Sequence, residues 1–501
     1  MPVPVWLRRW ISWPGTRTVV MLLAAAAYPL RAAAHGFDER YDLPAPLGYF
    51  VAGAALTVAV TLAIAVRFMR RVSDTSAVNG APSGRPIALG PALPVLRRLC
   101  RALGLFTFGT VLAAALWGTA DPLMNLAPTY VWIIWWIGLS LVVACTGNLW
   151  PVLDPWRTLF DLLDAAARRM GRAHGIALNL PWPRALGAWP AVALLLLWSW
   201  LEVVYPIATV PYRLGCAMLI WSAIMLAGMI VFGREVWQRH ADVFALYFDT
   251  LGRMAPLTRG DAPHTLTLRV PGAALSSAGD ASPAGMSGFI IAMLSTVLFD
   301  GLHGGQAWLL LEQALKRSVP QWVDVNGYFA GTVGLLSVWL GFFVAYRLTC
   351  ALTARVVPAT HAARTTSAIP WAQHFAFTLV PIAAAYNIAH NFSALLIQGQ
   401  NALALISDPF GWHWNFFGTA NLRVNIGLID AQVTWYVAIS AIVIGHVMAV
   451  WLAHRVALRE TGTARHAALA SLPLTLLMIV YTVISLLVIA EPMVRFDGVT
   501  G

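Results

Sequence analysis

The sequence predicts an all-α fold: a polytopic transmembrane helical bundle of about ten spans after an N-terminal signal peptide. Three observations support this fold class. Hydrophobic residues make up 59% of the 501 residues and charged residues only 11%, which lies outside the range of soluble globular domains. The mean hydropathy is +0.69. Apolar runs long enough to cross the roughly 30 Å hydrocarbon layer recur along the whole chain.

The predicted spans follow one another at short intervals. They cover residues 47–68, 102–119, 127–149, 186–206, 211–233, 285–302, 327–350, 370–398, 430–454 and 468–490. We find no internal repeat strong enough to indicate an inverted-repeat transporter. The sequence therefore predicts a single integral membrane domain at 35–501.

The N-terminus has the three parts of a secretory signal. Arg8, Arg9 and Arg17 precede the apolar run Thr18–Leu30, and three alanines at 32–34 follow it. A basic region, a short apolar region and an A-x-A site together predict a signal peptide at 1–34. Cleavage there would leave His35 as the first residue; the alternative is an uncleaved signal anchor.

Arginines are concentrated in alternate loops, as the positive-inside rule requires. This distribution places the loops 69–101, 150–185 and 234–284 in the cytoplasm. The last of them contains an alternating stretch at 265–270 that is typical of a strand. The net charge of +11 is thus explained by the membrane topology. Because the basic residues form no single stripe, we do not expect nucleic acid as a partner.

The chain has 23 tryptophans. Trp132, Trp135 and Trp136 lie in the outer half of one predicted span, and Trp150 and Trp156 flank its inner boundary. Tryptophans at these depths usually form the aromatic belts of a membrane protein. We therefore interpret most of them as interfacial residues.

Four histidines fall at the outer side of the predicted topology: His35, His303, His390 and His413. Imidazoles are common ligands of zinc and copper, and a ligand set drawn from separate helix ends leaves an open coordination position. An N-terminal His35 would chelate through both its amine and its ring, which favours copper. The sequence thus predicts an outer divalent-metal site, with packing of single histidines between helices as the alternative.

Two carboxylates are expected beside these histidines. Glu202 and Asp300 lie near the outer ends of their spans, where each would act as a ligand, a catalytic base or an orienting group. A buried charge pair or helix caps are the structural alternatives. Asn387, His390 and Asn391 share one helical face through their i, i+3, i+4 spacing.

A second group of histidines lies at the inner side. His374 and His446 are each in the inner half of an apolar span, where bis-histidine haem ligation is conceivable. Their depths differ, and the sequence has no CxxCH motif for covalent haem. Packing or interfacial roles are therefore favoured over haem. Walker, GxGxxG, HExxH and GxSxG motifs are likewise not found.

Several segments resemble the bacterial integral-membrane proteins called fenitrothion hydrolases. They include His35–Phe37, Tyr41–Pro46, Pro128–Trp136, Gly147–Trp150, Asp154–Thr158, Phe299–Gly301, Pro381–Gln400, Asp408–Pro409, Phe417–Ala420, Trp435–Tyr436 and Gly445–Val447. The resemblance spans most of the chain. Asn387 stands where this family is expected to have a histidine.

The resemblance implies hydrolysis of an organophosphate triester, with release of the nitrophenol, at the bacterial inner membrane. It also implies a hydrophobic small-molecule substrate, the lipid bilayer as environment and a second subunit as a partner. Two other hypotheses stay open. One is a non-catalytic membrane protein that binds copper or transports a small solute, and the other is a haem-bearing redox subunit.

Overall fold

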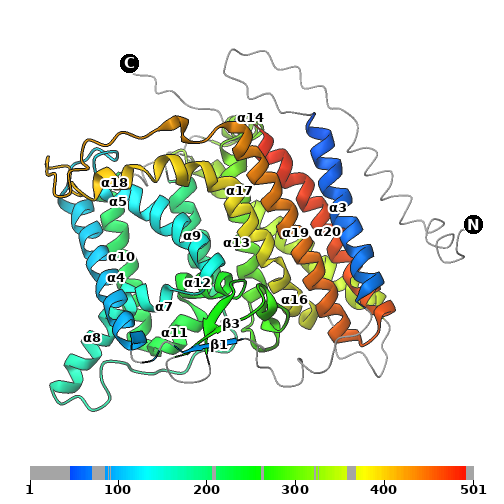
Figure 1. The fold of residues 1–501 in the computed structure, drawn as a ribbon, viewed down its shortest axis with the longest axis horizontal. Coiled ribbons are helices and arrows are strands. Elements are labelled where there is room, and N and C mark those ends of the chain that lie inside the picture. The colour runs from blue at the N-terminus through cyan, green and yellow to red at the C-terminus, as the bar shows by residue number, and fades with distance from the viewer. Residues whose placement is uncertain are drawn as a thin grey trace, which may run out of the picture.

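The computed structural model describes residues 46–69, 85–88, 90, 92–205, 210–260, 265–320, 323–324, 326–357 and 368–491. The predicted signal peptide at 1–34 and His35 lie outside these ranges. Within them, nine helices are long and apolar enough to cross a membrane. They stand together in one bundle (Figure 1). The prediction of an all-α, multi-pass membrane protein is confirmed.

Each span is either one helix or a run of consecutive helical segments. The spans are α3 (Leu47–Phe68), α4 (Ala92–Trp117), α5 with η1 and α6 (Leu126–Pro128, Thr129–Leu139, Ser140–Thr146), α10 (Pro211–Phe232), α13 (Met286–His303), α15 (Phe329–Val356), α16 with η4 and α17 (Ala368–Ala376, Phe377–Leu379, Val380–Gln398), α19 (Ala431–Thr461) and α20 (Ala464–Ala490). The shorter helical elements are α7 (Trp150–Leu153), α8 (Pro155–Arg169), α9 (Trp189–Val203), α11 (Arg234–His240), α12 (Val243–Gly252), η2 (Ala273–Ser276), η3 (Ala278–Ala281), α14 (Gln306–Ser318), α18 (Asn401–Leu405) and η5 (Ile426–Leu428). The element η1, in the third span, is a π-helix.

The run at 186–206, predicted as a tenth span, forms only the 15-residue helix α9. A proline lies in its first turn, and it ends at Val203, just before a Tyr205–Pro206 step that disfavours helical backbone. A helix of this length is about 22 Å long, shorter than the hydrocarbon layer. Helix α9 packs against α13. This packing holds Glu202, in the last turn of α9, inside the protein.

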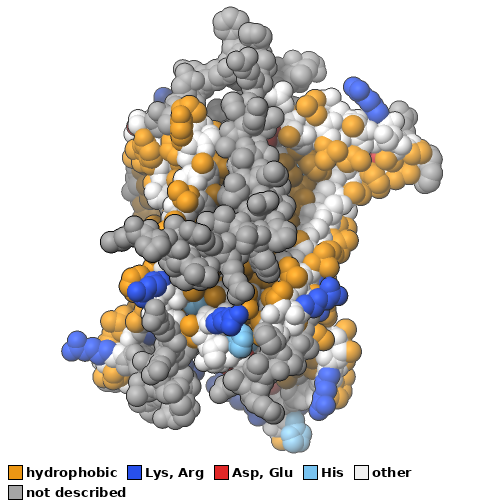
Figure 2. Space-filling view, turned by 90° about the vertical axis from the view of Figure 1, so that its right-hand side faces the viewer, with side chains coloured by type: hydrophobic (Ala, Val, Ile, Leu, Met, Phe, Trp, Pro, Cys, Tyr) orange, Lys and Arg blue, Asp and Glu red, His pale blue; other side chains and the backbone are white. Residues whose placement is uncertain are grey.

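Two of the predicted cytoplasmic loops meet in a small antiparallel sheet. Strand β1 (Arg85–Ala88) comes from the 69–101 loop, whereas β2 (Leu257–Arg259) and β3 (Thr265–Leu268) come from the 234–284 loop, in the order β1-β3-β2. The strand predicted at 265–270 is thereby confirmed. The sheet lies at the same end of the bundle as α8 and α11 (Figure 1). Figure 2 shows most of the visible Lys and Arg side chains toward this end.

The 234–284 loop does not lie wholly at the surface. Its helix α12 is buried inside the bundle, where Phe244, Tyr247 and Phe248 are exposed by 1%, 3% and 0%. The predicted loop therefore contains a buried helix, and its placement in the cytoplasm stays a prediction. The helix is buried because the run 243–252 is apolar, although it is too short to cross a bilayer.

Two carboxyl groups are buried together at the sheet end of the bundle, which is the inner end in the predicted topology. Asp154 caps α8 by accepting a hydrogen bond from the Arg157 N–H at 3.0 Å, and its second oxygen accepts one from the Gln238 amide at 2.8 Å. Asp242 caps α12. Both side chains are 0% exposed. Burial raises the pKa of both carboxyl groups, and the neighbouring Asp242 raises the pKa of Asp154 further.

Close backbone packing joins α17 to α19. A Cβ atom added at Gly445 of α19 would lie 2.5 Å from the Ala385 Cβ and 2.7 Å from the Pro381 carbonyl oxygen of α17. Because a backbone carbonyl cannot move aside, we expect Gly445→Ala to destabilise the protein by about 1–3 kcal/mol. Gly341→Ala on α15 is the control, since a Cβ there meets no atom within 4 Å. Unfolding of the detergent-solubilised protein in a denaturing detergent would measure both; equal effects would contradict the packing argument.

Candidate functional site

A histidine and a carboxylate meet between α17 and α13. The Nε2 atom of His390 lies 2.8 Å from Oδ2 of Asp300. The neighbouring Gly301 is closely packed, because a Cβ there would lie 3.1 Å from the Tyr386 hydroxyl. A carboxylate in this position fixes both the tautomer and the orientation of an imidazole. The histidine and the carboxylate were both predicted as site residues, and the structure brings them together.

Glu202 lies beside this pair. Its Oε2 atom accepts a hydrogen bond from the Trp136 indole N–H at 3.1 Å. The carboxyl group of Asp300 is close enough to interact electrostatically with that of Glu202. The last turns of α9 and α13 thus contribute two carboxyl groups, and the middle of α17 contributes one imidazole. We call Glu202, Asp300 and His390 the outer cluster.

Further polar side chains of α17, and one of α12, border the outer cluster. The Asn387 amide donates to the Tyr247 hydroxyl at 3.3 Å, and the Asn391 amide donates to the Asn387 oxygen at 3.4 Å. The ring of Tyr247 lies 4.7 Å from that of Trp136, centroid to centroid. Asn387 thus has a packing role against α12. The sequence analysis did not identify Tyr247, because the residues of α12 were predicted to be part of the 234–284 loop.

His303 is one helical turn beyond Asp300 on α13 and has mainly aromatic neighbours. Its ring lies 5.6 Å from the rings of both Phe299 and Trp308. Asp300 is near enough to interact with it electrostatically. Its surroundings therefore resemble those of a packed histidine at the edge of the outer cluster.

His413 lies in an exposed loop after α18. It has a positive φ of 66°, and its backbone N–H donates to Asp408 at 2.7 Å. In the described part of the chain, His303, His390 and His413 do not form one three-ligand group. Because His35 lies outside that part, the zinc or copper site with all four histidines stays a prediction.

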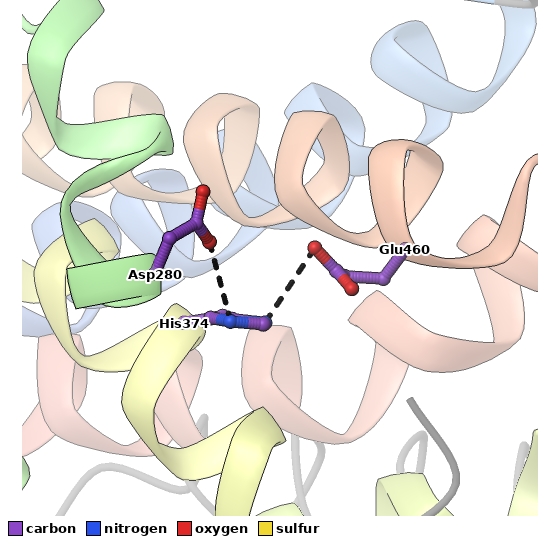
Figure 3. Close-up of side chains that lie close together, drawn as sticks. All are labelled: Asp280, His374 and Glu460. Atoms are coloured by element: carbon purple, nitrogen blue, oxygen red, sulfur yellow. Dashed lines mark ion pairs between the residues drawn. The ribbon is translucent and has the colours of Figure 1, made fainter. Parts of the chain in front are cut away.

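The three side chains that do come close enough to share a cation lie at the inner end (Figure 3). His374 of α16 stands between Asp280 of η3 and Glu460 of α19, with Nε2 3.3 Å from Asp280 and Nδ1 3.5 Å from Glu460. The guanidinium of Arg459 lies 2.8 Å from Asp280 and 2.9 Å from Glu460. A positive charge of the protein itself therefore already bridges the two carboxylates, which favours a structural ion-pair network here.

This network also bears on the haem hypothesis. Both ring nitrogens of His374 face carboxylates. The Nδ1 atom of His446 lies 2.8 Å from the Ile442 carbonyl oxygen, and its ring lies 5.9 Å from that of Tyr481. The sequence analysis did not identify Asp280 and Glu460 as neighbours of His374. Asp280 lies in a Gly, Ser and Ala stretch that resembles a linker. The surroundings of both histidines are typical of helix packing.

Of the two groups, the outer cluster is the one suited to proton transfer. Among the described residues no arginine pairs with Asp300, whereas Arg459 already neutralises Asp280 and Glu460, and a histidine oriented by a carboxylate is a common general base. The functional inference rests on this geometry. In comparisons with known proteins, no family model, no curated protein and no solved structure matches the chain.

Proposed function

We propose that the protein is a hydrolase of the bacterial inner membrane that cleaves organophosphate triesters, with His390 as the general base. The observation that carries this proposal is the 2.8 Å contact between His390 and Asp300 beside the carboxyl group of Glu202. The resemblance of the sequence to fenitrothion hydrolases supplies the substrate class. Apolar spans around the cluster suit a neutral aryl ester that partitions into lipid.

The reaction is an attack of water on phosphorus. His390 takes a proton from the water, a new P–O bond forms, and the P–O bond to the aryl group breaks. Asp300 stabilises the imidazolium that results, and the proton then passes to the departing aryl oxide. Glu202, held by the Trp136 indole N–H, supplies a second carboxyl group that interacts electrostatically with Asp300. If a zinc or copper ion were held by the other outer histidines, His35, His303 and His413, it would lower the pKa of the attacking water and leave His390 free to act as the base.

Membranes that contain the chain test the proposal with fenitrothion as the substrate. We expect release of the nitrophenol above the level of empty membranes, and a loss of about a hundredfold in His390→Ala, in line with the usual contribution of a general base. His174→Ala is the control, since His174 lies in an exposed segment beyond α8. No release by the wild type, or unchanged release by His390→Ala, would refute the assignment. Metal analysis of the same preparation tests the zinc or copper site.

One observation favours a second candidate, proton-coupled movement of a small solute. Asp300 and His390 are ionisable groups inside spans, where such residues often form proton relays, and Glu202 of α9 lies near Asp300. Reconstituted liposomes with a pH-sensitive dye distinguish the two functions. Proton uptake with a solute, without ester hydrolysis, would support transport, whereas hydrolysis without proton movement supports the hydrolase.

A further inference from the structure

The aromatic side chains exposed at the outer end of the bundle include a group that belongs to a loop rather than to a span. Trp132, Trp150 and Trp156, which were predicted to be interfacial, are only 9%, 3% and 5% exposed, so the prediction of an interfacial belt is wrong for them. Exposed rings lie instead between α18 and α19. We call residues 407–429 the outer loop.

The outer loop exposes much apolar surface. Its most exposed apolar side chains are Trp412 (47%), Phe416 (64%), Phe417 (68%), Leu422 (53%), Ile426 (77%) and Leu428 (54%). Between Asp408 and Asp430 the sequence has no acidic residue, and Arg423 is the one Lys or Arg. Clustered apolar side chains at a surface mark contact with a membrane or with another protein.

Four of the aromatic rings form a row. The ring centroids of Phe410, Trp412, Trp414 and Phe416 lie 4.5, 5.0 and 4.9 Å apart in that order. Each separation is within the range of favourable contacts between aromatic rings. The contacts hold the rings in a fixed arrangement, although the loop has only the short 3₁₀ turn η5 as regular structure.

Side chains pair with seven backbone N–H groups of the outer loop. Asp408 accepts two of them, at 2.9 and 2.7 Å, and the Ser407 hydroxyl accepts two more, at 3.1 and 3.2 Å. The other three donate to the amide oxygens of Gln400, Asn415 and Asn425. Irregular backbone is costly near lipid unless its polar groups are paired. This pairing therefore removes much of the cost of placing the loop against lipid.

The outer loop continues the lipid-facing surface of a span. Helix α4 is at the edge of the bundle (Figure 1) and exposes Phe106 and Trp117 by 72% and 69%. In a membrane these side chains face lipid. Just beyond the outer end of α4, the Thr119 N–H donates to the Phe410 carbonyl oxygen at 2.8 Å. The apolar surface of the loop thus begins where that of α4 ends.

We propose that the outer loop lies in the interfacial layer of the adjacent leaflet, which is the outer leaflet in the predicted topology. Its rings would contact phospholipid head groups and the upper acyl chains, the depth that Trp side chains favour. Continuity with α4 and the scarcity of charge favour a zwitterionic lipid surface over a protein partner. The inference goes beyond the proposed hydrolase, because it requires no turnover and the loop contains no residue of the outer cluster.

Fluorescence quenching tests the proposal on the full chain in lipid nanodiscs. The dye NBD is attached at Phe416→Cys in a variant whose four native cysteines are replaced by alanine. The quencher is phosphatidylcholine with a spin label near its head group. Phe106→Cys on α4 and Arg259→Cys at the exposed end of β2 are the references for lipid and for water. We expect the Phe416 probe to be quenched about twofold or more as strongly as the Arg259 probe.

Aqueous iodide separates the other possible surroundings of the loop. Strong quenching of the Phe416 probe by iodide, with no more quenching by lipid than at Arg259, would place the loop in water and overturn the proposal. Protection from both quenchers would show that a protein surface, such as that of a second copy, covers the loop, and would overturn it as well. The Phe106 probe should be quenched by spin-labelled lipid and protected from iodide.

Asp408→Ala tests the role of the backbone pairing. This change leaves two backbone N–H groups without their acceptor, so the Phe416 probe should lose most of the lipid quenching that exceeds the Arg259 value. Asp430→Ala is the matched control, because Asp430 accepts from the Val433 N–H of α19 at 2.6 Å and should leave the quenching unchanged. Undiminished quenching in Asp408→Ala, with the variant shown to be folded by gel filtration, overturns the role assigned to the pairing.

Discussion

Replacing Arg459 with methionine is expected to destabilise the protein by about 3 kcal/mol or more, as is usual when one partner of a buried ion pair is removed. The Arg459 guanidinium contacts Asp280 and Glu460, and it also donates to the Ser276 carbonyl oxygen at 2.9 Å. The side chain of Glu460 is only 5% exposed. Without the guanidinium, its charge would lose a partner 2.9 Å away in a site that water barely reaches. Unfolding in a denaturing detergent measures the change.

Arg455→Met provides a matched control on the same helix. The Arg455 guanidinium lies 5.5 Å from the centre of the Trp451 ring, a contact usually worth less than about 1 kcal/mol at an exposed site. The double variant Arg459→Met with Glu460→Gln should recover much of the loss, because the buried charge is then removed as well. An effect of Arg459→Met no larger than that of Arg455→Met, or no recovery in the double variant, would show that the ion pairs contribute little.

Hydropathy predicts the spans well because a span is a local property of the sequence. The exceptions are α9 and α12, where short apolar runs are stabilised by burial against other helices. Hydropathy alone cannot tell a short helix that packs inside a bundle from one that crosses the bilayer. Hydropathy likewise cannot predict that β1 pairs with β3, because residues 85 and 268 meet only in the folded chain.

The candidate site was predictable in part. Asp300 and His390 stood out because ionisable residues in apolar helices are costly, and their side chains do meet. Trp136 and Tyr247 did not stand out, because a tryptophan in a span and a tyrosine in a presumed loop are common. Their roles depend on contacts between elements far apart in sequence.

The buried carboxyl pair at the inner end predicts that stability falls as pH rises. Burial, with the nearby Asp242, raises the pKa of Asp154 to about 8, whereas an unfolded Asp has a pKa near 4. Between these values the folded protein holds a proton that the unfolded chain has released. Each pH unit in that window therefore removes about 1.4 kcal/mol of stability. From pH 5 to pH 7 the expected loss is roughly 3 kcal/mol.

Asp154→Asn should remove most of this pH dependence while it keeps the cap of α8, because an asparagine side chain also accepts the Arg157 N–H. Asp164→Asn is the control. The pKa of Asp164 is lowered by its hydrogen bond from Arg168, so that group is already ionised at pH 5 in both states and cannot produce the slope. The free energy of unfolding of the wild type and of both variants, measured at pH 5, 6 and 7, tests this prediction. A slope that persists in Asp154→Asn would assign the proton to another group, whereas its loss there, and not in Asp164→Asn, places it on the Asp154 and Asp242 pair that joins α8 to α12.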